Sequence, residues 1–174
     1  MTSFIERMVG AAKLNVGTYE EVEADVSGTG QAMGVVLLSS VAAGVGALGL
    51  GPAVILVAVV ALFRWVIWAF LTYIVGTRLL PEPQTEADMG QMMRTLGFAQ
   101  SPGVLRVFGS IPGIGLFVLG VVEAWMLIAM VIAVRQALDY TTTWRAAAVC
   151  IVAGLAAIIL VILLSILIGA PAGG

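Results

Sequence analysis

The stretch VSGTGQAMGVVLLSSVAAGVGALGLGPAVILVAVVALF, residues 26–63, decides the fold, because it runs for 38 residues without a charged side chain. A helix needs about 20 apolar residues to cross a bilayer core of about 30 Å, so this stretch is too long for one span and about right for two. Gly49–Pro52 is the expected turn between them, since glycine favours turns and Pro52 suits the first position of a helix. The predicted spans are 31–49 and 52–76.

The composition of the whole chain indicates the same class of protein. Of its 174 residues, 61% are hydrophobic and only 10% are charged, and the mean hydropathy is +1.11. Soluble domains typically have about 45–50% apolar and about 25% charged residues, so a soluble enzyme, a disordered tail and a disulfide-rich secreted domain are excluded. The sequence therefore predicts an all-α integral membrane protein.

The charged and metal-binding residue types narrow the function further. Eight Lys and Arg against ten Asp and Glu give a net charge of −2, which leaves no basic surplus for nucleic acid. The chain has no His and one Cys, Cys150, whereas haem, zinc and thiolate-metal sites need imidazole groups or several thiols. Neither a metal nor a cofactor is predicted.

Two further spans are plain, and one is ambiguous. Residues 112–134 and 146–169 are long apolar runs. Residues 90–108 are interrupted by Ser101-Pro102, a pair that suits the start of a second short helix. They form either a weak span or a short helix followed by half a span. The predicted organisation is 1–30 as an N-terminal helical segment, 31–169 as the membrane domain and 170–174 as a tail.

The distribution of basic residues favours a five-span bundle. With 90–108 as a span, one side of the membrane receives no Lys or Arg, and the other receives Arg7, Lys13, Arg78, Arg94, Arg135 and Arg145. Because basic residues concentrate in cytoplasmic loops, the N-terminus is expected in the cytoplasm and the C-terminus outside. With only four spans, Arg135 and Arg145 would lie outside.

Two short helices are expected before the first span. Ser3-x-x-Glu6 is a capping box. It opens an amphipathic helix whose apolar stripe is Phe4, Ile5, Met8, Val9 and Leu14. This helix is expected to lie in the membrane interface, and a frayed N-terminus is the alternative. Thr18-x-x-Glu21 predicts the start of a second, acidic helix.

Two charged residues lie in the middle of predicted spans. Arg64 is residue 13 of the 25 in 52–76, and Glu123 is residue 12 of the 23 in 112–134. A charge at the bilayer midplane costs about 2.5–3.5 kcal/mol unless it is paired or hydrated. The sequence therefore predicts an Arg64–Glu123 ion pair, which either locks two helices together or forms a polar, ion-coupled site. Arg106 either snorkels to the headgroups or contacts a lipid phosphate.

No pair of nucleophile and base is visible. The hydroxyl side chains in the apolar runs have no His and no nearby acid to activate them: Ser39, Ser40, Thr72 and Ser165. Serine and threonine in such helices usually bond to the helix backbone. The chain is not expected to be an enzyme.

Five segments, taken in order, carry a family resemblance: TYEEVEAD (18–25), WAFLTYIVG (68–76), MMRTLGFAQSPGVL (92–105), EAWMLIAMVIAVRQAL (123–138) and TTTWRAAA (141–148). The chain resembles the Yip-one domain (Ypt/Rab-interacting protein) family, and specifically its bacterial members, over roughly residues 15–169. The resemblance implies five spans, a cytoplasmic N-terminus and no catalytic residue. The chain lacks the DLYGP motif and the long N-terminal domain of eukaryotic members, so their roles with Rab GTPases in vesicle traffic do not carry over.

The leading functional hypothesis is a non-enzymatic membrane scaffold or accessory protein. Its expected partners are membrane lipids, other membrane proteins or a second copy of the chain, with bilayer shaping as a further role. One alternative is a small transporter or channel component built on Arg64 and Glu123. The other is a peripheral structural subunit of a larger membrane complex. The expected location is a bacterial inner or plasma membrane.

Overall fold

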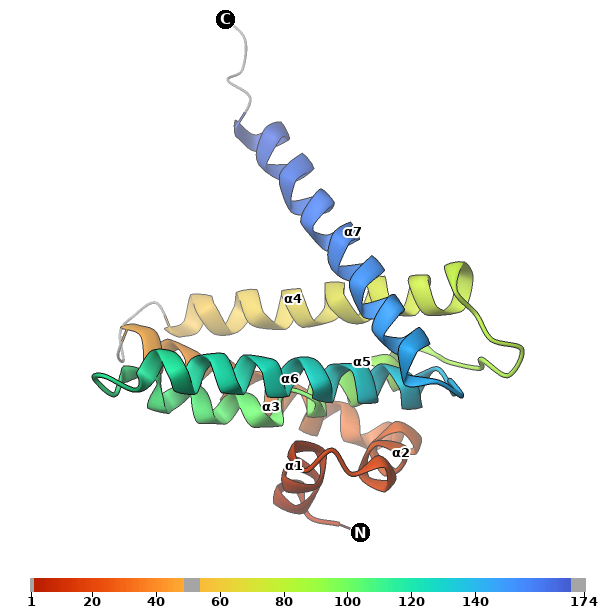
Figure 1. Ribbon diagram of the computed structural model, residues 1–174, viewed down its shortest axis with the longest axis horizontal. Coiled ribbons are helices and arrows are strands. Elements are labelled where there is room, and N and C mark those ends of the chain that lie inside the picture. Colours follow the sequence, from red (N-terminus) through yellow and green to blue (C-terminus); the bar gives the residue numbers. More distant parts are fainter. Residues whose placement is uncertain (1, 49–53, 170–174) are drawn as a thin grey trace, which may run out of the picture.

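The computed structural model describes residues 2–48 and 54–169, and all regular secondary structure in these ranges is helical. The α-helices are α1 (Phe4–Ala12), α2 (Val16–Ala24), α3 (Thr29–Leu48), α4 (Val54–Ile74), α5 (Met89–Phe98), α6 (Gly115–Ala137) and α7 (Thr143–Gly169). Three short segments have other helical geometry: the 3₁₀ helices η1 (Val26–Gly28) and η3 (Ser101–Ser110), and the π-helical turn η2 (Val75–Leu79). As Figure 1 shows, α4 and α6 run side by side, and α7 starts near the end of α6 and crosses α4 at an angle.

Four helical segments of the described residues are long and apolar enough to cross a membrane: Val26–Gly46, Val59–Leu79, Gly115–Ala137 and Thr143–Ile166. They match the predicted spans 31–49, 52–76, 112–134 and 146–169. The all-helical membrane class is therefore confirmed. The predicted turn at Gly49–Pro52 and the predicted tail 170–174 lie outside the described residues.

The predicted span 90–108 is not one continuous helix. It is divided between α5, which Asp88 and Gln91 open with a capping box, and η3, which has Pro102 in its first turn. Pro102 carries no N–H for a helical hydrogen bond, so the α-helix does not continue through it. α5 packs against α3, α4 and α6, and η3 packs against α3 and α6. The two short helices thus run inside the bundle.

The N-terminal helices lie along one side of this bundle (Figure 1). The capping box of Ser3 and Glu6 is confirmed at the start of α1. The expected start of α2 at Thr18 is wrong, because the side chain of Asn15 accepts the Thr18 N–H and the helix begins at Val16. In the middle of α6, the Trp125 indole donates a 2.8 Å hydrogen bond to the carbonyl of Ala12.

Two buried arginines fasten α1 and α2 to the bundle. The Arg7 guanidinium lies 2.9 Å from Oε1 of Glu21 and 2.7 Å from Oδ2 of Asp25, and it donates to Oε1 of Gln31 at 3.0 Å. Arg94 on α5 donates to the last carbonyls of α2, which have no partner inside the helix. Polar contacts therefore hold these two short helices in place.

Glu23 lies half-buried in this polar contact and makes it sensitive to pH. Burial and the negative charges of Asp139, Glu20 and Asp88 raise the pKa of Glu23 from 4.5 to about 7, although Arg94 opposes them. Since the folded-state pKa lies above the ordinary value, folding favours the protonated carboxyl. This contribution to stability is full below pH 4.5 and is lost as the pH rises through about 7.

We expect Glu23→Gln to remove the loss of stability that the natural chain undergoes as the pH rises through about 7. At alkaline pH the variant should be more stable than the natural chain by roughly 1–2 kcal/mol, once solvent screening is allowed for. Thermal unfolding in detergent, measured as a pH series, provides the test. Glu86→Gln, at an exposed position, is the control and should follow the natural chain. Parallel pH profiles for Glu23→Gln and the natural chain would contradict the expectation.

The connections 80–88 and 138–142 form a polar end of the bundle (Figure 1). Glu82 accepts hydrogen bonds from the backbone N–H and the hydroxyl of Thr141, and its carboxylate lies 3.3 Å from Nε of Arg145. The hydroxyl of Tyr140 donates to the carbonyls of Gly76 and Leu80 at 3.0 and 2.7 Å. The opposite end, residues 111–114, carries no charge.

Exposed apolar side chains form a belt around the bundle. The belt includes exposed side chains within 55–56 and 59–70 on α4, 116–128 on α6 and 151–166 on α7. Its length along α4 is roughly 22 Å at 1.5 Å per residue, most of a bilayer core. Phe70 and Ile128 mark its edge on the side of the polar end, which gives a depth scale for the charged residues inside the bundle.

Candidate functional site

Glu123 on α6 forms an ion pair with Arg106 on η3. Nε of Arg106 donates to Oε1 of Glu123 at 2.8 Å, and Nη2 contacts the same oxygen. The side chain of Arg106 is 11% exposed and that of Glu123 is 54% exposed. The prediction that Glu123 pairs with Arg64 is therefore wrong, because the cation that pairs with Glu123 is Arg106. Arg106, which the sequence places at the headgroups or at a lipid phosphate, contacts the exposed carboxylate of Glu123.

The close approach of η3 to α3 brings Arg106 into this position. A Cβ added at Gly46 of α3 would overlap the backbone oxygen of Arg106, and one added at Gly103 would lie 3.0 Å from Sδ of Met126. Small residues allow membrane helices to pack this closely. Gly46 and Gly103 thus determine which arginine lies beside Glu123.

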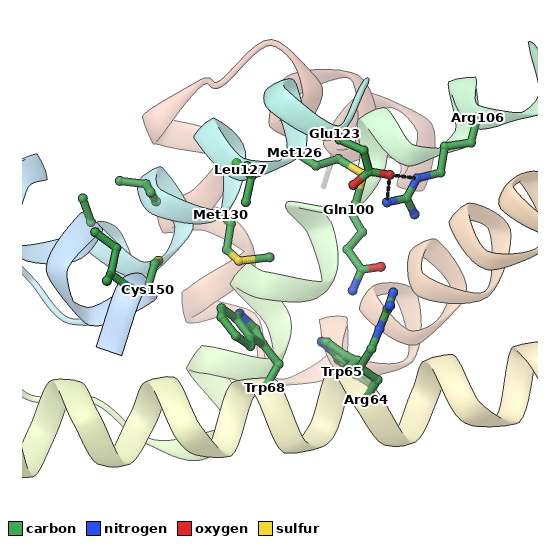
Figure 2. Close-up of a pocket in the computed structure, with 13 residues that line it drawn as sticks. Arg64, Trp65, Trp68, Gln100, Arg106, Glu123, Met126, Leu127, Met130 and Cys150 are labelled. Atoms are coloured by element: carbon green, nitrogen blue, oxygen red, sulfur yellow. Dashed lines mark hydrogen bonds and ion pairs between the residues drawn. The ribbon is translucent and has the colours of Figure 1, made fainter. Parts of the chain in front are cut away.

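Arg64 faces the same site from α4, without a carboxylate of its own. Among the described residues, no Asp or Glu oxygen lies within 4.0 Å of its guanidinium. Figure 2 shows its side chain pointing from α4 toward Gln100, which lies between it and Glu123. The neighbouring Trp65 is fixed by a 3.1 Å hydrogen bond from its indole to the carbonyl of Met93. The three predicted site residues therefore lie together, but only two of them pair.

Two cavities meet at Arg64, Arg106 and Glu123. The first, of about 560 Å³, lies between α4, α6 and α7, and apart from the charged residues and Gln100 its walls are mainly Trp65, Trp68, Met126, Leu127, Met130 and Cys150 (Figure 2). The second, of about 520 Å³, extends toward residues 111–114 and is lined by Ser40, Ala43, Leu56, Val60, Ala61 and Leu119. Pockets of this size, apolar with a few polar groups, suit small ligands.

The charged residues lie inside the apolar belt but closer to its polar edge. Arg64 is six residues from Phe70 and Glu123 is five from Ile128, so both lie roughly 7–9 Å inside that edge.

Sequence reasoning finds the three charged residues but not the cavity around them. Trp68, Met130 and Cys150 read as ordinary apolar helix positions, and they become a wall only because α7 crosses α4 and α6. Gln100 follows the end of α5 and enters the site because the chain breaks there. The only sequence signal for it is a polar side chain inside a candidate span.

The polar groups of the site are few. They are two guanidinium groups, one carboxylate and one amide. Within 2–48 and 54–169, no group of three His, Cys, Asp or Glu side chains is arranged to hold a metal ion. Ser40, the hydroxyl residue of the second cavity, donates to the carbonyl of Val36 at 2.7 Å, as serines of apolar helices usually do.

The fold and the site define a helical membrane protein with two apolar cavities that meet at three charged side chains. No protein-family model, no curated protein and no solved structure matches the chain. The cavities and charged residues of the site are therefore the basis for the proposed function.

Proposed function

We propose that the chain is a non-enzymatic membrane accessory or scaffold protein that binds a membrane lipid in the cavities between α4 and α6. The observation that carries the proposal is the pair of cavities of about 560 and 520 Å³, whose apolar walls meet at three charged side chains. A lipid is the partner that a bilayer supplies to such a site. Its headgroup needs a polar contact and its tail needs apolar walls.

The proposal includes a five-pass topology with the N-terminus in the cytoplasm. α5 and η3 together form the third pass, since they run alongside α3 and α6 (Figure 1). Arg78, Arg135 and Arg145 then lie at one end of the bundle, on the cytoplasmic side. An interfacial position for the amphipathic helix α1 is part of the proposal, and its apolar stripe supports it. The resemblance to the bacterial Yip-one domain proteins supports this topology.

Filling the second cavity should expel the lipid. In Ala61→Phe the new ring occupies space beside Arg64, so we expect the protein purified in mild detergent to lose the lipid that native mass spectrometry detects on the natural chain. Ala157→Phe on α7 is the matched control, because Ala157 lies outside both cavities. Equal lipid occupancy in both variants would place the lipid elsewhere. A natural chain that carries no lipid would refute the proposal.

A small transporter or channel component is the second candidate. The two cavities extend from the charged residues toward opposite ends of the bundle, and a path for a solute would need that arrangement. Retention of lipid by the natural chain favours the first candidate, because a bound tail blocks such a path.

A further inference from the structure

We propose that the site selects a long-chain monocarboxylic acid, such as a free fatty acid, whose carboxylate binds Arg64 and whose tail lies in the second cavity. The inference rests on the proposed lipid binding and names its ligand class. Three features of the site support it: its net charge, the hydrogen-bond donors around Arg64, and the size and direction of the second cavity.

The charges of the site leave one cation unbalanced. Arg64 and Arg106 contribute two positive charges and Glu123 one negative charge, so the net charge is +1. Glu123 is held by Arg106, and an unpaired charge is costly at this depth. A ligand with one negative charge neutralises the site. A doubly charged phosphate monoester makes the net charge of the site negative, and a neutral lipid leaves Arg64 unpaired.

The donors around Arg64 suit a carboxylate. A guanidinium presents several N–H groups in a plane and binds a carboxylate through two parallel hydrogen bonds. The amide of Gln100 lies beside it and adds further N–H groups (Figure 2). The indole N–H of Trp68, in the wall of the first cavity, is buried without an acceptor. The polar part of the site is thus rich in donors, while Arg106 already holds one oxygen of its one carboxylate, Oε1 of Glu123.

The second cavity suits a single tail. Its walls beyond the charges are apolar except for Ser40, whose hydroxyl is bonded to its own helix. A volume of about 520 Å³ is that of a pocket for one small ligand and is too small for both tails of a phospholipid. A lipid from the leaflet at the polar end has its acid nearest that end and its tail toward the bilayer centre. This direction leads from Arg64 into the second cavity.

The decisive comparison is between oleate and oleyl alcohol, which have the same tail and differ only in the acid group. Natural chain, Arg64→Gln, Arg64→Lys and Arg78→Gln are titrated at alkaline pH with oleate, oleyl alcohol, phosphatidate and phosphatidylcholine, and the bound fraction is measured by native mass spectrometry. We expect the natural chain to bind oleate about tenfold more tightly than oleyl alcohol, since a charge-assisted hydrogen bond is lost with the acid. Arg64→Gln should bind both equally. Arg64→Lys should keep part of the preference, and Arg78→Gln all of it, because Arg78 lies outside both cavities.

Four results would overturn the inference, and they separate it from the proposed function. Equal affinity for oleate and oleyl alcohol on the natural chain would leave lipid binding standing and remove the recognition of the acid. Tighter binding of phosphatidate than of oleate would replace the single-tail acid by an acidic phospholipid. Absence of binding by all four ligands would end both proposals. A preference for oleate that persists in Arg64→Gln would assign the acid to another residue.

Discussion

Replacing Arg7 by methionine should detach α1 and α2 from the bundle and cost about 3 kcal/mol of stability. The Arg7 side chain is 5% exposed, and it is the shared partner of Glu21, Asp25 and Gln31. Removing one partner of a buried ion pair typically costs about 3–5 kcal/mol, because the remaining charge stays buried and unpaired. The lower value applies here, since the carboxylates of Glu21 and Asp25 are 36% and 26% exposed and regain some water.

The effect of Arg7→Met is measured by thermal unfolding in detergent. A loss of about 3 kcal/mol corresponds to a decrease of roughly 6–12 °C in the midpoint for a chain of this length. Lys13→Met is the control, because it removes an exposed cation that forms no ion pair among the described residues. Arg7→Lys should lie between the two, since one ammonium cannot span all three acceptors. Equal midpoints for Arg7→Met and Lys13→Met would show that the cluster contributes nothing.

Replacing Gly97 by valine should force α5 away from α3, at a cost of about 2–3 kcal/mol. A Cβ at this position would lie 2.7 Å from Cβ of Ala32 and 3.1 Å from its carbonyl oxygen, and Ala32 is fully buried. The obstacle is a short side chain and the backbone itself, so no rotamer change relieves it. Because η3 follows directly on α5, the displacement should also disturb the Arg106–Glu123 pair.

Gly120→Val separates this steric effect from a change in helix propensity. Gly120 is also a helix glycine, but a Cβ there meets nothing within 4 Å. The propensity term is similar at both positions, so the difference between the two midpoints measures the packing at Gly97 alone. We also expect Gly97→Val to lose bound lipid. Similar midpoints for the two variants would mean that α5 has room to move.

The spans were predictable because each is encoded by its own residues. A long apolar run without charges crosses a bilayer whatever its neighbours are, and the runs at 112–134 and 146–169 appear as α6 and α7. The capping box of Ser3 and Glu6 is equally local and is confirmed. The predicted start of α2 was wrong by three residues, because Asn15 caps the helix in place of Thr18.

The partner of Glu123 depended on the packing of helices that are distant in sequence. Depth along the chain placed Arg64 and Glu123 at one level, and both do line the same cavities. Depth says nothing of which helices are neighbours. Gly46 and Gly103 allow η3 to pack closely against the bundle. Arg106, rather than Arg64, therefore lies beside the carboxylate of Glu123.

The sequence by itself determined the class of this protein: an all-helical membrane chain with three charges in its apolar core. Hydropathy and charge are properties of single residues and act over one helix length, so they can be read along the chain. The tertiary structure alone decided that Arg106 pairs with Glu123, that Arg64 is left without a carboxylate, and that α7 crosses α4 and α6 to enclose a cavity. These features arise from contacts between helices, whose geometry is set by the close packing of small residues on several segments at once.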